Sequence, residues 1–172
     1  MIHLYIGNGK GKTTAAAGLA VRALGRGLKV LFAQFLKNRD TGEKLFLEKF
    51  PDMLFFRPDQ RHHVFLWNMT EEQLNDTKED ILKGWLSLKG EIFSKHWDVV
   101  ILDEILDVIH NGLILESEVL ELIINTPSGV EIVCTGRDAS GIFREKSDYI
   151  THMEAVKHPY CIGIAARRGI EY

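Results

Sequence analysis

Short apolar runs alternate along the chain with segments that repeat hydrophobic residues at helical spacing. The runs that predict β-strands are residues 2–6, 29–35, 53–57, 99–102, 131–135 and 149–156. The helical patterns cover residues 12–24, 43–50, 70–95, 105–111, 117–125 and 140–147. Strands separated by helices favour right-handed βαβ crossovers and a mainly parallel sheet. The pattern therefore predicts an α/β fold with helices on both faces of a central sheet.

Local signals place several boundaries of these elements. The first helix should end before Gly25 and Gly27, because glycine favours helix termination. The segment Thr70–Gln73 has capping-box spacing and should open the longest helix. Of the two glycines within that helix, Gly84 and Gly90, the second weakens its end. No internal repeat, low-complexity tract or linker interrupts the chain, so residues 1–172 are expected to form a single domain.

Composition narrows the classes of function. A length of 172 residues allows a sizeable core, and 45% hydrophobic and 26% charged residues are ordinary for a globular protein. The net charge of −3 provides no general basic field for nucleic acid. No apolar run approaches the roughly 20 residues that span a bilayer, and the first residues lack a signal peptide's basic start. Cys134 and Cys161 show no CxxC spacing, which favours a reducing compartment. We expect a cytoplasmic protein with no nucleic-acid or membrane partner.

A glycine-rich loop between the first strand and the first helix predicts a phosphate-binding site. Its sequence is Gly7-Asn8-Gly9-Lys10-Gly11-Lys12-Thr13-Thr14. Glycines allow successive backbone N–H groups to turn inward, and the helix that follows adds its positive dipole end. Lys12 supplies a charge to the phosphates of ATP, and the hydroxyl of Thr13 is a ligand for Mg²⁺.

The loop departs from the ordinary phosphate-loop spacing. In G-x-x-x-x-G-K-[ST] the first glycine would stand at position 6, which is occupied by Ile6. The loop is thus one residue shorter, and the path of the phosphates is expected to differ from that in an ordinary ATPase. A dinucleotide-binding loop is excluded, because Lys12 occupies the third glycine position and the second strand ends near Gln34 instead of an acid.

A second candidate feature is the pair of acids that follows the apolar strand at residues 99–102. In phosphate-loop proteins a strand of this kind lies beside the first strand and brings an acid to Mg²⁺. Asp103 and Glu104 are therefore candidate metal ligands. Alternatively, Asp103 simply caps the short helix that follows.

Other reactive side chains have simpler interpretations. None of the seven histidines has a metal-ligand spacing such as H-x-x-x-H. Cys134 lies in an apolar strand and is expected in the core. The default interpretation of Arg57, Arg61 and the pair Arg167-Arg168 is solvated surface.

Several blocks together resemble the ATP:corrinoid adenosyltransferases of the CobA/BtuR type, in the same order and over nearly the whole chain. Beside the short loop, they are Arg22-Ala23-Leu24-Gly25, Gln34-Phe35-Leu36-Lys37, Phe65-x-Trp67, Val100-Ile101-Leu102-Asp103-Glu104-Ile105, Thr135-Gly136-Arg137 and the tail from Val156 to Tyr172. The resemblance implies a RecA-like, P-loop NTPase-type three-layer sandwich. It also implies transfer of the 5′-deoxyadenosyl group of ATP to the cobalt(I) of a corrinoid such as cobalamin, with release of triphosphate.

The resemblance also implies roles for particular residues and partners. Arg22 and Glu104 would contact the nucleotide, bound backwards relative to ordinary phosphate-loop enzymes, and Arg137 would contact its phosphates. Phe65 and Trp67 match the aromatic residues that displace the lower axial ligand of the corrinoid, which eases reduction to cobalt(I). A homodimer and a flavoprotein electron donor are expected from the same likeness. Relatives often differ near residues 138–141 and 165–168, and some carry an N-terminal extension.

Two other functions fit part of the pattern. A phosphate-cleaving ATPase of the partition type also ends its loop in Gly-Lys-Thr-Thr, but its loop carries a lysine where Asn8 stands here. A nucleotide-binding regulator would bind ATP without turnover. The products separate the three: triphosphate with an adenosylated corrinoid, ADP with phosphate, or no product.

Overall fold

In the computed structural model of the chain, residues 1–37, 39–58, 61 and 66–172 are described, apart from the side chains of Trp67 and Tyr160. Their strands and helices alternate as the sequence predicts. The strands are β1 (Ile2–Ile6), β2 (Val30–Gln34), β3 (Met53–Phe56), β4 (Val99–Asp103), β5 (Glu131–Gly136) and β6 (Tyr149–His152). The α-helices are α1 (Lys12–Leu24), α2 (Gly42–Leu47), α3 (Glu71–Ser94), α4 (Ile105–His110), α5 (Glu116–Asn125) and α6 (Gly141–Lys146). Two 3₁₀ turns complete them, η1 (Leu66–Asn68) and η2 (Pro159–Ile162).

The six strands form one parallel sheet in the order β3-β2-β4-β5-β1-β6. This confirms the predicted parallel sheet. The expectation that the acid-bearing strand lies beside the first strand is wrong, because β5 lies between β1 and β4. Periodicity within a strand carries no information about its neighbours, so the sequence did not distinguish the two orders.

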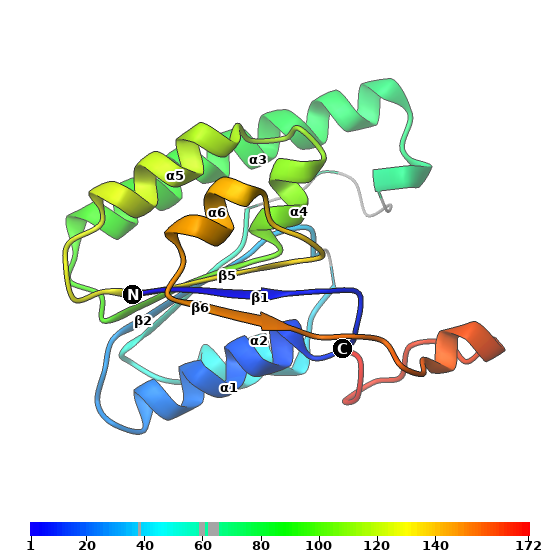
Figure 1. Cartoon of the computed structure of the whole chain (residues 1–172), viewed down its shortest axis with the longest axis horizontal. Coiled ribbons are helices and arrows are strands. Elements are labelled where there is room, and N and C mark those ends of the chain that lie inside the picture. Colours follow the sequence, from blue (N-terminus) through cyan, green and yellow to red (C-terminus); the bar gives the residue numbers. More distant parts are fainter. Residues whose placement is uncertain (38, 59–60, 62–65) are drawn as a thin grey trace.

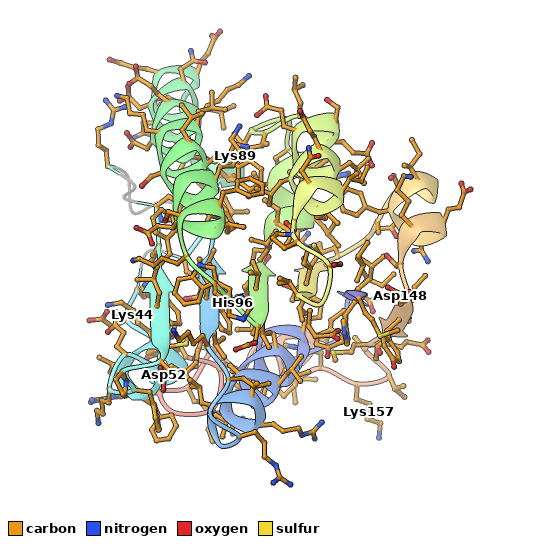
Figure 2. The ribbon with its side chains drawn as sticks, turned by 90° about the vertical axis from the view of Figure 1, so that its left-hand side faces the viewer. Lys44, Asp52, Lys89, His96, Asp148 and Lys157 are labelled. Carbon is orange, nitrogen blue, oxygen red and sulfur yellow. The ribbon has the colours of Figure 1, made fainter. Side chains whose placement is uncertain are left out.

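Helices cover both faces of the sheet (Figure 1). Helices α3, α4, α5 and α6 lie on one face, and α1 and α2 lie on the other. Figure 2 shows the layers nearly end-on, with Lys89 on the α3 side of the sheet and Asp52 beside α2 on the opposite side. The larger core lies under α3 and α5 and includes Trp85, and the smaller core lies under the alanine-rich α1. The small side chains let α1 approach the sheet closely.

Burial of the strands explains their composition. Every residue of β2 and β4 is buried, as expected for central strands that are covered on both faces. The edge strand β6 is exposed along its length. It ends at His152, four residues before the predicted end, because the next residue leaves the sheet and crosses the glycine-rich loop: Met153 N–H donates to Ile6 O, and Met153 O accepts from Gly9 N–H.

The capping box at the start of α3 is confirmed. Gln73 N–H donates to Thr70 Oγ1 at 3.3 Å, and Thr70 N–H donates to Gln73 Oε1 at 3.0 Å. Helix α3 then runs for 24 residues and buries Trp85 among its core residues. Within the described part of the chain, no helix has both the length and the apolar character needed to cross a membrane.

Candidate active site

The carboxyl ends of the central strands meet at one edge of the sheet, where a cavity of about 1070 Å³ opens. In parallel α/β sheets this edge is the usual place for a ligand. The phosphate loop follows β1, Lys37 follows β2, Glu104 follows β4 and Arg137 follows β5. All of these segments line the cavity, as do residues 8–14 of the loop. The sequence predictions for the loop, Glu104 and Arg137 therefore converge on one place.

The loop is shaped by a segment that crosses it. A Cβ on Gly7 would lie 2.2 Å from the carbonyl oxygen of Met153, and one on Gly9 would lie 2.7 Å from the same atom. Glycine is required at both positions for this reason, and Gly7 also has φ +117. Gly7 N–H donates to Arg137 O at 2.9 Å, and Gly9 N–H donates to Met153 O at 2.8 Å. The expectation that successive loop N–H groups all turn inward is thus wrong for these two. An anion must use other N–H groups of the loop and the first turn of α1.

Lys12 is folded back onto its own loop. Its Nζ donates to the carbonyl oxygens of Gly7 at 2.7 Å and Gly9 at 3.0 Å. Lys12 is the first residue of α1, and the unpaired N–H groups of that first turn favour negative charge nearby. A bound polyphosphate would offer Lys12 charged acceptors in place of neutral carbonyls, and such hydrogen bonds are stronger.

Asp103 is the buried centre of the site. The hydroxyl of Thr13 donates to both of its carboxylate oxygens, at 3.0 and 3.1 Å. Thr135 donates to Oδ1 at 2.7 Å, and Gln34 Nε2 donates to Oδ2 at 3.1 Å. Thr13 reaches Asp103 across β5 because α1 packs over both β4 and β5. Helix packing therefore joins the loop to the acid, although their strands are not neighbours.

Burial disfavours the ionised form of two acids of the site, Asp103 and Glu104. It raises the pKa of Asp103, and the nearby charge of Glu104 raises it further. Burial likewise raises the pKa of Glu104, whereas Lys37 opposes the shift through its Nζ, 3.5 Å from the Glu104 carboxylate. Asp107 lies nearby and accepts a hydrogen bond from Arg137 N–H at 3.0 Å. Lys37 and Arg137 are the cations that lie against Glu104 and Asp107, at 3.5 and 3.8 Å.

The oxygen atoms of Thr13 and Asp103 suit Mg²⁺. One is a hydroxyl oxygen and the other belongs to a carboxylate, and both are hard ligands of the kind that Mg²⁺ prefers. Among the residues that the structure describes, no group of three or more His, Cys, Asp or Glu side chains is arranged for a metal. A protein that offers so few ligands fits Mg²⁺, which usually keeps water and substrate phosphates in its coordination sphere. Of the three predicted metal ligands, Thr13 and Asp103 contact each other, whereas Glu104 pairs with Lys37.

Two residues at this edge have a left-handed backbone. Leu36 has φ 54 and Glu104 has φ 65, and both line the cavity. Such conformations cost about 1–3 kcal/mol for a residue with a side chain, and they concentrate at functional sites. They turn the chain sharply at the ends of β2 and β4, which directs Lys37 and Glu104 towards each other.

A polar network behind Asp103 was not recognised from the sequence. Arg57 donates to Gln34 Oε1 and, at 2.8 Å, to Arg39 O. Gln34 Nε2 donates both to Asp103 and to Glu43 Oε1, the latter at 3.2 Å. The interpretation of Arg57 as solvated surface is wrong, because its guanidinium is half-buried against Gln34. The available signal was a glutamine at the end of an otherwise apolar, buried strand.

The other predicted residues lie away from the cavity or fall outside the described part of the chain. Arg22 is exposed and lies about 15 Å along α1 from Lys12, and it does not line the cavity. Phe65 falls outside the described residues, and the side chain of Trp67 does as well. Its neighbour Leu66, in η1, lines the cavity. The tail, for which the sequence shows no period, lines the same cavity through Ala166 and residues 169–172.

Comparison with known proteins fits this geometry. The family model described as ATP:corrinoid adenosyltransferase BtuR/CobO/CobP matches residues 1–172. The chain belongs to this family. Among its relatives, the corrinoid adenosyltransferase of Pseudomonas aeruginosa is 33% identical over 98% of this chain and 82% of its own length. That of Escherichia coli K12 is 32% identical over 100% and 85%, and Corrinoid adenosyltransferase CobA of Salmonella typhimurium is 31% identical over the same shares. In this member of the family, the segment at Met153 crosses the short glycine-rich loop.

Proposed function

We propose that the chain transfers the 5′-deoxyadenosyl group of ATP to the cobalt(I) of a corrinoid and releases inorganic triphosphate. Membership of the family supports the reaction. The observation that carries the proposal is the pairing of the short loop with Asp103 through Thr13 at the mouth of a large cavity. This combination provides a polyphosphate site and a place for a divalent cation, with room beside them for a second substrate.

In the proposed reaction, the electron pair of cobalt(I) attacks C5′ of ATP. A cobalt–carbon bond forms, and the bond between C5′ and the triphosphate oxygen breaks with its electron pair left on that oxygen. The protein lowers the barrier by stabilising the charge of the departing triphosphate. Lys12, released from the carbonyls of Gly7 and Gly9, and the first turn of α1 are placed for this task. Holding cobalt, carbon and oxygen in line supplies a further contribution.

Mg²⁺ is the proposed metal, held by Thr13 and Asp103 together with phosphate oxygens. When bound, it neutralises charge on the phosphates. Glu104 and Arg137 line the cavity and are the proposed contacts to the nucleotide. Arg137 is three-quarters exposed, which leaves its guanidinium accessible to phosphate. For Arg22 the support comes from the family resemblance alone, as its exposed side chain lies away from the cavity lining.

The corrinoid is proposed to bind on the side of the cavity near η1. Leu66 and Met69 line this side, and Phe65 and Trp67, the proposed groups that displace the lower axial ligand, are adjacent in sequence. A flavoprotein electron donor and a homodimer are proposed from the family. The cytoplasm is the proposed compartment, because the reaction consumes ATP and both described cysteines are free thiols.

Product analysis tests the proposed function. The assay is anaerobic and contains ATP, Mg²⁺ and chemically reduced cobalamin, and it follows visible absorbance together with the phosphate products. We expect adenosylated cobalamin and triphosphate in equal amounts. ADP with phosphate would support a phosphate-cleaving ATPase instead, and nucleotide binding without any product would support a regulator.

The same assay tests the role of the loop lysine. We expect Lys12→Ala to lower kcat/KM about 100- to 1000-fold, since it removes a charge that stabilises the leaving triphosphate. Lys146→Ala, an exposed lysine of α6, is the matched control and should retain full activity. Near-normal turnover by Lys12→Ala would exclude the loop from the mechanism.

A further inference from the structure

The C-terminal tail places a carboxylate beside the phosphate loop. Ala166, Gly169 and residues 170–172 form part of the cavity wall that faces the loop. Glu171 Oε1 lies 3.3 Å from Nζ of Lys10, a loop residue that also lines the cavity. Glu171 thus sets a negative charge against a cation of the loop, where an anionic ligand would compete with it. Figure 1 shows the tail beyond the carboxyl ends of the strands, on the side where the loop lies.

The tail is also attached to the loop at its beginning. Gly9 N–H donates to Met153 O at 2.8 Å, and Ala155 N–H donates to Asn8 Oδ1 at 3.1 Å. The chain therefore leaves the loop at Ala155 and returns to it at Glu171. Because the tail contacts the loop at both of these points, the fold holds Glu171 next to Lys10.

Arg167 holds the carboxylate of Glu171 in its charged form. The backbone N–H of Arg167 donates to Glu171 Oε2 at 2.8 Å, and its Nη2 donates to Oε1 at 3.0 Å. These hydrogen bonds, with a smaller contribution from Lys10, lower the pKa of Glu171 to about 2. The side chain of Lys10 is 48% exposed and that of Glu171 is 22% exposed, so a ligand in the cavity can reach Lys10.

We propose that Glu171 is a positioning residue that acts through Lys10, competing with the released triphosphate for this lysine and so weakening product binding. The inference rests on the proposed function, in which the loop that contains Lys10 binds the polyphosphate. When triphosphate binds, Lys10 exchanges its ion pair with Glu171 for one with the triphosphate. When triphosphate dissociates, the ion pair between Lys10 and Glu171 forms again. A loop without such a competitor would hold its highly charged product tightly, and release of product limits turnover in many enzymes.

Arg167 has an opposing role in this arrangement. It neutralises Glu171 from the other side and so limits the attraction between Glu171 and Lys10. Removing the charge of Glu171 and removing the charge of Arg167 should therefore change triphosphate affinity in opposite directions. A tail that only supports the cavity wall predicts a different result, because loosening it by either substitution would weaken binding.

The experiment measures the binding of inorganic triphosphate with Mg²⁺ to the full chain by calorimetry. We expect Glu171→Gln to lower the Kd about two- to fivefold, the size of effect that one exposed ion pair supports. Arg167→Met should raise the Kd. In a Lys10→Met background, Glu171→Gln should have little effect. Glu145→Gln, an exposed acid of α6, makes the same change in net charge and should leave the Kd unaltered.

The outcomes separate the inference from the proposed function. Unchanged or weaker triphosphate binding by Glu171→Gln, in a chain whose wild type binds triphosphate, would overturn the role of Glu171 alone. An equal effect of Glu171→Gln with and without Lys10 would also overturn it. A wild-type chain that binds no triphosphate at all would contradict both. Circular dichroism and thermal unfolding show whether each variant is folded.

Discussion

Asp103 has no exposed surface, yet it accepts hydrogen bonds from Thr13, Gln34 and Thr135. A buried carboxylate is costly even when it is hydrogen-bonded, and its raised pKa reflects this cost. A hydrophobic residue at this position would in turn leave the buried amide of Gln34 and hydroxyl of Thr135 without their acceptor. An acid at this position is expected under the proposed function, in which Thr13 and Asp103 hold a cation against the phosphates.

Cys134 allows a test of burial that is independent of the proposed function. Its thiol is fully buried in β5, and burial raises its pKa to about 12 from the usual 9.0. Between these two values the folded chain keeps a proton that the unfolded chain loses. The free energy of unfolding should therefore fall as pH rises above 9, by about 1.4 kcal/mol per pH unit from this group. Below pH 8 the group contributes no pH dependence.

Chemical denaturation at pH 8 to 11 measures this slope, and Cys134→Ala provides the comparison because it lacks the titrating thiol. Wild type should lose stability more steeply than the variant over this range. Parallel curves would show that the thiol ionises equally in both states. In the native state at pH 8, only the exposed Cys161 should react with a thiol reagent.

Among the elements, α3 contains two glycines, Gly84 and Gly90, whose surroundings differ. A Cβ on Gly84 would lie 2.6 Å from Cβ of Pro58, whereas one on Gly90 would meet no atom within 4 Å. Gly84→Ala should therefore destabilise the chain by about 1–3 kcal/mol through overpacking. Gly90→Ala should stabilise it by about 0.5–1 kcal/mol, because alanine loses less backbone entropy in a helix.

Urea denaturation of the two alanine variants measures the difference. They have the same helix, the same substitution and opposite expected signs, so each serves as the control for the other. A stabilising effect at both positions would show that Pro58 moves aside at little cost.

The boundaries of elements were predicted well where the chain carries a local signal. Helix α1 spans the predicted residues, and the capping box opens α3. The predictions failed where a contact distant in sequence decides the outcome. The end of β6 is set by the loop that Met153 crosses, and the burial of Arg57 is set by Gln34 on another strand. Neither contact leaves a periodic pattern.

At the scale of the whole molecule, the site too was predicted where a local signal exists and not where a contact distant in sequence decides. The loop and Asp103 were both predicted, because each stands at the end of an apolar strand. They were expected to meet through neighbouring strands, whereas they meet across β5, which depends on the strand order and on the packing of α1 over β4 and β5. The tail was singled out by the family resemblance, but its contact with the loop was not predicted, because an aperiodic segment gives no sign of such a contact.

A site assembled from both ends of the chain should link nucleotide binding to global stability. A ligand that binds only the folded state raises the free energy of unfolding by about 2.7 kcal/mol at 100 times its Kd. For a chain of this length that is a rise in Tm on the order of 5 to 10 °C. We expect Mg-ATP to produce this rise in wild type and Lys12→Ala to abolish most of it. Trp67→Ala should retain the rise, because the proposed role of Trp67 concerns the corrinoid and not ATP.

Thermal unfolding with and without Mg-ATP measures the shift, and adenosylation of cobalamin supplied as cobalt(II) with a reductant provides the second readout. Trp67→Ala should impair this reduction-coupled activity while it keeps the shift in Tm. An unchanged reduction-coupled rate would exclude Trp67 from displacement of the axial ligand. Loss of both the shift and the rate would show instead that η1 supports the nucleotide site, because Leu66 lines the same cavity as the loop.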